Sequence, residues 1–148
     1  MESGEWRFSH TLRSPLFQRT MTSHTAIHTE NAPKALGPYS QGTRWGDLIF
    51  TAGQVAVDPA TNTFIDGDIT AQTRRVLQNL QAVLQEGGSD FSKVLKTTVY
   101  LTTMDNFAAM NAVYKEYMTG VFPGRTTIAV AQLPLGALVE IECVAYSE

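Results

Sequence analysis

The apolar residues of this chain change their spacing along the sequence, and that change is what most constrains the fold. From residue 70 to 86 they recur at intervals of three and four, the spacing of one helix face: Val76, Leu77, Leu80, Val83 and Leu84. Asp68 or Thr70 can cap the start of this helix. A second segment of this kind follows Asp105, which we expect to be its N-cap, and ends before Gly120. Each predicted helix therefore has one apolar face that another layer must cover.

Four segments are predicted to be strands, because they are rich in apolar, β-branched and aromatic residues: 48–52, 94–101, 126–130 and 139–145. The last of them alternates strictly, with Val139, Ile141, Cys143 and Ala145 on one face and Glu140, Glu142 and Val144 on the other. The first face should pack on the helices. The second mixes carboxylates with an apolar residue, which suits a subunit interface.

The order of these elements is strands, helix, strand, helix, strands. It predicts an α+β domain in which two helices pack on one face of a mixed β-sheet. The length of 148 residues fits one domain of this kind. The other face of the sheet would stay open, and an open, partly apolar sheet face predicts an oligomer.

Several classes of function are disfavoured by composition. The three histidines, His10, His24 and His28, all lie near the N-terminus, so the body lacks Ser-His-Asp and Cys-His catalytic groups. Cys143 is the one cysteine, which excludes a zinc site of several cysteines, and we expect a buried, inert thiol. The net charge of −3 disfavours binding to nucleic acid, and no apolar run is long enough to span a bilayer.

Residues 1–30 differ from the rest and are predicted to be an N-terminal extension, followed by the folded domain over residues 31–148. Three arginines separated by Ser and Thr partly match a mitochondrial presequence, whereas Glu2, Glu5 and Pro15 argue against one. The alternative is a disordered tail. The expected location is therefore mitochondrial or cytoplasmic.

Four motifs occur in order through the body. They are GPYSQ (37–41), TAGQ (51–54), KTTVY (96–100), and FPGRTT (122–127), the last running through Leu133-Pro134 to EIE (140–142). Together they resemble the RidA (YjgF/YER057c/UK114) family of enamine/imine deaminases over roughly residues 24–147. The resemblance implies a chorismate-mutase-like fold and a homotrimer with active sites between neighbouring subunits. It also implies that neither a cofactor nor a metal is needed.

The activity implied by the resemblance is hydrolysis of reactive 2-imino acids, such as 2-iminobutanoate and 2-iminopropanoate, to 2-oxo acids and ammonia. Arg125 matches the arginine that binds the substrate, and a guanidinium can hold a carboxylate with two hydrogen bonds. Glu140 matches the acidic residue of the family and could activate water and return a proton. The residues alone leave Glu140 and Glu142 equal, and only the resemblance favours Glu140.

The resemblance also assigns substrate contacts to Tyr39, Asn111, Gly53 and Thr127. Each has a purely structural alternative: a packed aromatic for Tyr39, a surface amide for Asn111, and a tight turn for Gly53. Two positions depart from the common pattern, because Ala52 replaces a serine and Thr127 replaces a cysteine. These departures affect the preferred substrate more than the class of reaction.

The expected partners are a small 2-imino acid and two further copies of the chain, with no nucleic acid and no membrane. Two other functions stay open at this point. The same cleft could bind a keto acid without turnover, or the open sheet face could act in a chaperone-like way. Some members of the family are described as ribonucleases or translation inhibitors, a role for which this chain lacks histidines in its body.

Overall fold

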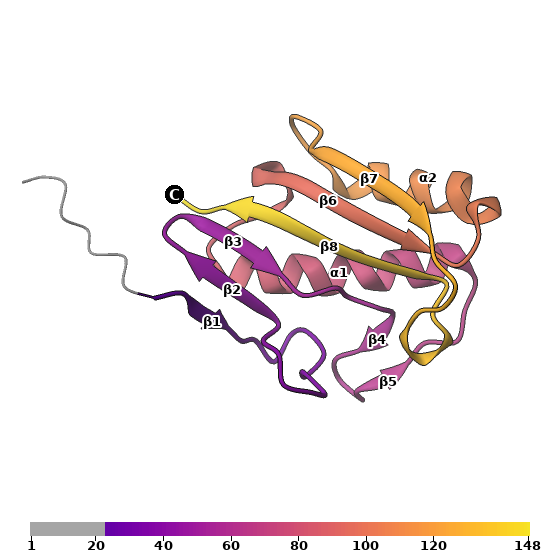
Figure 1. The fold of residues 1–148 in the computed structure, drawn as a ribbon, viewed down its shortest axis with the longest axis horizontal. Helices are drawn as coiled ribbons and strands as arrows, with labels where there is room; N and C mark the ends of the chain where they lie inside the picture. Colours follow the sequence, from indigo (N-terminus) through magenta and orange to yellow (C-terminus); the bar gives the residue numbers. More distant parts are fainter. Residues whose placement is uncertain (1–22) are drawn as a thin grey trace, which may run out of the picture.

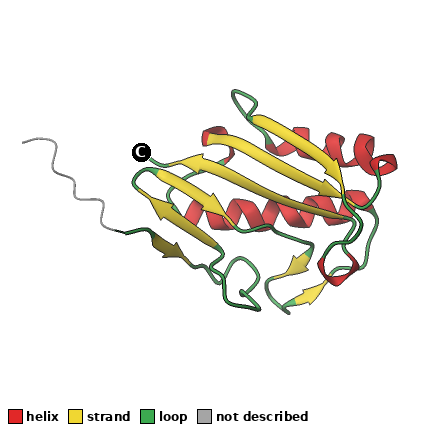
Figure 2. Ribbon diagram, in the orientation of Figure 1, coloured by secondary structure: helices red, strands yellow, loops and turns green. Residues whose placement is uncertain are grey.

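The computed structural model describes residues 23–148, which form a six-stranded sheet with two helices on one of its faces (Figures 1 and 2). The strands follow one another across the sheet in the order β1-β2-β3-β8-β6-β7. Their bounds are β1 Thr25–Ile27, β2 Gly42–Trp45, β3 Leu48–Thr51, β6 Val94–Leu101, β7 Gly124–Ala129 and β8 Val139–Tyr146. Only β6 and β7 run parallel, so the sheet is mixed as predicted. A separate hairpin joins β4 (Val57–Asp58) to β5 (Thr63–Phe64).

The two helices, α1 (Ile69–Glu86) and α2 (Phe107–Tyr117), lie behind the sheet in the view of Figure 1. The predicted apolar face of α1 is fully buried: Val76, Leu77, Leu80, Val83 and Leu84 are each 0% exposed. Asp68 caps this helix by accepting a hydrogen bond from the Ala71 amide at 2.8 Å, which decides between the two predicted caps. Among residues 23–148, no helix combines the length and apolar character that crossing a membrane requires.

The second helix begins differently from our prediction, which made Asp105 its cap. Residues Met104–Asn106 form a short 3₁₀ helix, and Thr103 caps it by accepting a hydrogen bond from the Asp105 amide at 3.2 Å. The α-helix then starts at Phe107, and Asn106 before it makes no side-chain cap. The prediction for Asp105 was wrong because the extra 3₁₀ turn moves the cap two residues toward the N-terminus.

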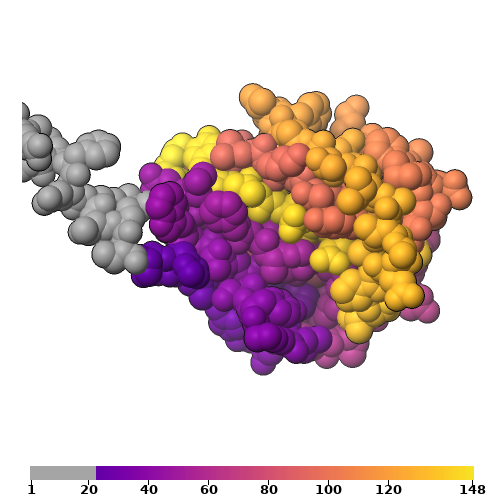
Figure 3. All heavy atoms as spheres, viewed as in Figure 1, coloured from indigo at the N-terminus to yellow at the C-terminus, as the bar shows by residue number. Residues whose placement is uncertain are grey.

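The last strand confirms the predicted alternation. Its residues Val139, Ile141, Cys143 and Ala145 are all buried against the helices. Glu140, Glu142 and Val144 are half-buried on the opposite face. No helix of the described chain covers that face, which is the one turned toward the viewer in Figure 3.

Strand β1 lies before residue 31, where we expected the folded domain to begin. It pairs with β2 in the register Thr25 to Arg44 and Ile27 to Gly42, which adds these residues to the sheet. Residues 1–22 lie outside the described part of the chain. The predicted targeting segment or tail therefore stays a prediction.

Gln41 holds residues 29–33, the segment after β1, in place through side-chain hydrogen bonds. The oxygen of its buried side-chain amide accepts a hydrogen bond from the backbone N–H of Thr29 at 2.7 Å. The amide nitrogen donates to the carbonyls of Thr29, Ala32 and Pro33 at 3.0, 3.1 and 2.8 Å. This one side chain therefore satisfies the backbone of a loop that has no strand partner of its own.

Replacing Gln41 with leucine is expected to lower the free energy of unfolding by about 3 kcal/mol, because buried backbone groups would lose their partners. Urea denaturation followed by circular dichroism measures this change. Gln78→Leu on the half-buried side of α1 is the control and should change stability much less. Equal stability of the two variants would contradict the role given to Gln41.

Candidate functional site

The two residues predicted to carry the chemistry lie on opposite faces of the sheet. In the pairing register, Arg125 of β7 stands beside Thr97 of β6, and Thr97 stands beside Cys143 of β8. Paired residues share a face, so Arg125 lies on the helix side. Glu140 alternates with the buried residues of β8 and pairs with Tyr100, so it lies on the open side. One subunit therefore does not bring Arg125 and Glu140 together.

Glu140 lines a hollow of about 530 Å³. Tyr39 and Gly53 line the same hollow, so three of the predicted site residues meet there. Burial of the Glu140 carboxyl raises its pKa, and the nearby Glu142 raises it further. Among residues 23–148 nothing donates a hydrogen bond to this carboxylate, which leaves its oxygens available to a ligand or to water.

Gly53 leaves the space that the Glu140 side chain occupies. A Cβ atom on Gly53 would lie 2.9 Å from the carboxyl carbon of Glu140, so a larger residue here would displace the Glu140 side chain. The next residue, Gln54, pairs its backbone with Ile141 of β8 through hydrogen bonds of 2.9 and 3.2 Å. The glycine therefore lets the Glu140 side chain lie directly against the backbone where the chain pairs with β8.

Tyr39 lies at the rim of this hollow and is 54% exposed. Its hydroxyl accepts a hydrogen bond from the Leu36 amide at 3.2 Å. The ring is thus anchored within its own turn, while one side of it faces solvent. This position suits a contact with a bound molecule better than the alternative of a packed turn aromatic.

Arg125 is held by three side chains of α2. Its Nη1 donates to Oδ1 of Asn111 at 2.7 Å, and its guanidinium carbon lies 4.7 Å from the ring centre of Tyr114 and 5.6 Å from that of Phe107. The Tyr114 hydroxyl in turn shares a hydrogen bond of 2.7 Å with Thr97 on β6. No carboxylate of residues 23–148 pairs with Arg125, so its charge is not neutralised by an ion pair there. The guanidinium is positioned by cation–π contacts and remains free to take an anion.

The two rings beside Arg125 are not among the residues that the sequence predicted for the site. Phe107, Asn111 and Tyr114 stand at positions i, i+4 and i+7 and so share one helix face. Burial raises the pKa of the Tyr114 phenol, so the ring stays neutral beside the cation. Two aromatics and an amide at this spacing, facing a strand with an arginine, are the signal that could have found them.

Thr127 follows Arg125 by two residues on β7 and therefore lies on the same side of the sheet. Its hydroxyl oxygen is buried and has no hydrogen-bond partner within residues 23–148. Arg125 lines a second hollow together with Asn111, Tyr114, Lys115, Phe122 and Pro123. Thr127 lines neither this hollow nor that of Glu140. The structure therefore brings Arg125 together with Asn111, and Glu140 together with Tyr39 and Gly53, with Thr127 beside the first group.

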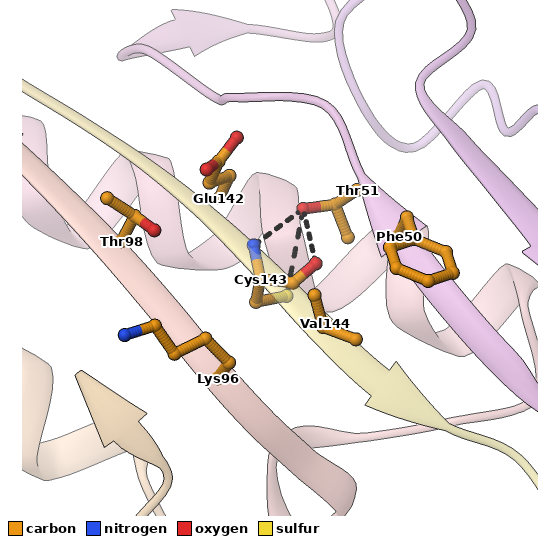
Figure 4. Close-up of a pocket in the computed structure, with 7 residues that line it drawn as sticks. All are labelled: Phe50, Thr51, Lys96, Thr98, Glu142, Cys143 and Val144. Atoms are coloured by element: carbon orange, nitrogen blue, oxygen red, sulfur yellow. Dashed lines mark hydrogen bonds between the residues drawn. The ribbon is translucent and has the colours of Figure 1, made fainter. Parts of the chain in front are cut away.

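The open face of the sheet holds a smaller hollow of about 220 Å³ around Glu142 (Figure 4). Glu142 accepts a hydrogen bond from the Tyr100 hydroxyl at 3.1 Å, and Lys96 donates to Thr126 at 2.7 Å. Glu142 is thus engaged within the sheet face, whereas Glu140 is not. This difference separates two carboxylates that the residues alone could not distinguish.

Cys143 is 3% exposed, and burial raises the pKa of its thiol to about 12. A thiol in this state is neither a nucleophile nor a metal ligand at neutral pH. The described residues also hold no group of three His, Cys, Asp or Glu side chains that could bind a metal ion.

We expect Ellman's reagent at pH 8 to label Cys143 only after unfolding in guanidinium chloride. Rapid labelling of the native protein would contradict this placement.

Comparison with known proteins was made on sequence and on structure. Residues 29–147 match the family model described as endoribonuclease L-PSP. The chain is 41% identical over 119 residues to the 2-iminobutanoate/2-iminopropanoate deaminase of Mus musculus, covering 80% of this chain and 88% of the relative. It is 38% identical over 143 residues to the chloroplastic Reactive Intermediate Deaminase A of Arabidopsis thaliana, covering 93% and 76%.

Among solved structures, the YjgF gene product of E. coli superposes with a TM-score of 0.80 at 38% identity, covering 84% of this chain and 99% of that one. The fold expected from the resemblance is thereby confirmed for the single subunit. The trimer stays a prediction.

Proposed function

The chain belongs to the endoribonuclease L-PSP (RidA/YjgF) family, and we propose that it is an imine deaminase that hydrolyses 2-imino acids to 2-oxo acids and ammonia. The observation that carries this proposal is the guanidinium of Arg125. It is half-buried, fixed by Asn111 and Tyr114, and has no carboxylate partner among residues 23–148. The carboxylate of a small acid is the partner that such a group fits best. Two relatives whose names include a deaminase activity support the same reading.

The active site is proposed to form between two subunits of a homotrimer. Arg125 and Glu140 lie on opposite faces of one sheet, so a molecule of a few atoms reaches both only if each comes from a different copy. The open face supplies a surface for assembly, since large apolar side chains are exposed on it. They are Trp45, Phe50, Ile128 and Tyr146, at 50%, 42%, 42% and 36% exposure.

Binding is proposed to begin with the substrate carboxylate on Arg125 and Asn111, with Thr127 beside them. Burial of this pair between Phe107 and Tyr114 strengthens the contact relative to one in open water. The imine carbon then points toward the neighbouring subunit, where Tyr39, Gly53 and Glu140 line the second half of the cleft.

The reaction is proposed to use Glu140 as the proton carrier. Its carboxylate takes a proton from water while the oxygen bonds to the imine carbon and the π electrons of the C=N bond move to nitrogen. Glu140 gives this proton to the nitrogen, which yields the carbinolamine. Glu140 then takes the hydroxyl proton and passes it to the nitrogen as the C=O bond forms and the C–N bond breaks, so that the 2-oxo acid and ammonia leave. General acid–base help of this kind contributes about 10²–10⁴-fold.

The proposal is tested by generating 2-iminobutanoate with threonine dehydratase and trapping what remains with semicarbazide. The protein should lower the yield of semicarbazone and speed the appearance of 2-oxobutanoate. Sedimentation of the same sample should give three times the subunit mass. An unchanged semicarbazone yield would refute the deaminase, and tight binding of 2-oxobutanoate without turnover would instead favour a binding protein.

The ribonuclease alternative is tested on the same preparation. The histidines of the chain are confined to positions 10, 24 and 28. His28 lies on the surface, with its Nε2 3.1 Å from a carboxylate oxygen of Glu30. We therefore expect no cleavage of a single-stranded RNA by protein that hydrolyses imines. RNA cleavage that survives in the Arg125→Ala variant would revive this alternative.

A further inference from the structure

The hollow beside Glu140 is larger and more apolar than a three- or four-carbon substrate requires. Its volume of about 530 Å³ falls in the range of sites that hold drug-sized molecules. Apolar side chains from three separate loops line it. They are Pro33, Leu36, Pro38, Val55, Pro134 and Leu135.

The polar groups around the hollow are mostly committed elsewhere. The Gln41 amide bonds only to the backbone of residues 29–33. Lys34 pairs with Glu30 at 3.8 Å, and Asn62 accepts a hydrogen bond from the Lys34 amide at 3.3 Å. Ala52 adds only a methyl group to the lining. Tyr39, Gln54 and the exposed ammonium of Lys34 are the other polar groups of the lining, and the rest of the wall is apolar.

Leu135 is held in an unusual conformation at the edge of this hollow. Its φ of 60° lies in the left-handed region, which leucine rarely adopts, and its side chain is 58% exposed. Gly136 follows with a φ of 71°, so the turn presents the leucine over the hollow. An exposed apolar side chain kept in a strained conformation is a pointer to a binding role, because packing does not explain it.

We propose that this hollow receives the side chain of the 2-imino acid and makes the protein selective for bulky apolar side chains, with Leu135 as a specificity-determining residue. The inference rests on the proposed function. The carboxylate is fixed on Arg125 of one subunit, and the imine carbon lies at Glu140 of the next. The substituent on that carbon then extends along Leu36 and Leu135, where each added methylene leaves water for an apolar wall.

The test compares two imino acids made in place by an amino acid oxidase, with semicarbazide as the trap. These are 2-imino-4-methylpentanoate from leucine and 2-iminopropanoate from alanine. We expect the wild-type kcat/KM to be at least about tenfold higher for the larger substrate, since a methylene in an apolar pocket changes this ratio by about 10–200-fold. Leu135→Asn should lower that preference about tenfold.

The variant is chosen because asparagine adopts the left-handed region more readily than leucine, so it should fold at least as well as the wild type. Met104→Asn is the matched control: Met104 is 48% exposed, lies outside the hollow, and its variant should keep the wild-type preference. Sedimentation of each variant shows whether the trimer is intact.

The outcomes separate this inference from the function on which it rests. If the wild type hydrolyses neither substrate, the proposed function fails. If it hydrolyses both and the preference is absent, or is unaltered in Leu135→Asn, only the selectivity is refuted. Dissociation of the Leu135→Asn trimer would identify the hollow as part of the subunit contact and would also overturn the inference.

Discussion

Replacing Arg125 with alanine is expected to lower kcat/KM for hydrolysis of 2-iminobutanoate about a hundredfold. The guanidinium is fixed by neighbouring side chains, through Asn111 at 2.7 Å and the ring of Tyr114 at 4.7 Å. A charge-assisted hydrogen bond contributes about 1.5–3 kcal/mol, and each 1.4 kcal/mol is a factor of ten in rate. Most of the loss should fall on KM, because the group binds the carboxylate in the ground state as well.

Two further variants make this result specific. Arg125→Lys keeps the charge but loses the planar pair of donors, so its kcat/KM should lie between the wild type and the alanine variant. Arg74→Ala is the control. Arg74 pairs with Glu116 at 2.6 Å on the surface, and it lines neither the hollow of Glu140 nor that of Arg125. Wild-type kcat/KM in Arg125→Ala, with the trimer intact, would show that the carboxylate binds elsewhere.

Mixing two inactive variants is expected to restore about a quarter of the wild-type activity, because each site is built from two subunits. Arg125→Ala lacks the carboxylate-binding group, and Glu140→Gln lacks the proton carrier. In a randomly mixed trimer, a site is complete when the Glu140→Gln subunit supplies the arginine and its Arg125→Ala neighbour supplies the glutamate. Each condition is met half of the time across the whole mixture, which makes about one site in four active under cyclic symmetry, and about one in three in the isolated mixed trimers.

The mixture is prepared by refolding the two variants together with different affinity tags, and mixed trimers are isolated by both tags. The control mixes Glu140→Gln with Glu140→Ala, a pair in which no arrangement gives a complete site. Isolated mixed trimers without activity would mean that Arg125 and Glu140 do not act in one shared site. Activity in the control would trace the signal to contamination.

Several features of this protein could be predicted because they depend on local periodicity. The buried face of α1 and the alternation of β8 follow from the spacing of apolar residues, which each segment carries whatever its neighbours are. Asp68 was among the predicted caps because a carboxylate before an amphipathic helix satisfies free amides. The cap of α2 could not be predicted in this way, since its position depends on an added 3₁₀ turn.

The candidate site was predicted through the family resemblance rather than from the residues. Periodicity left Glu140 and Glu142 equivalent, because both lie on one face of the same strand. The contacts separate them: Glu142 accepts a hydrogen bond from Tyr100, while Glu140 lies against Gly53 in an apolar hollow. The support of Arg125 by Phe107 and Tyr114 could not be predicted from spacing either. Aromatic residues on one helix face predict that the face is buried, but they do not identify the residues against which it packs.

The sequence by itself therefore determined the elements and the face that each turns to the core, since hydrophobic spacing acts over a few residues. Only the tertiary structure decided which strands are neighbours. It made β1 a strand through pairing with β2, although three residues are too few to show any period. It also placed β7 parallel beside β6, with β8 and β6 between it and β3, in a register that turns Arg125 toward the helices and away from Glu140. Strand order and register arise from contacts between distant segments, and for that reason the division of the site between the two faces of the sheet could not be deduced from the sequence.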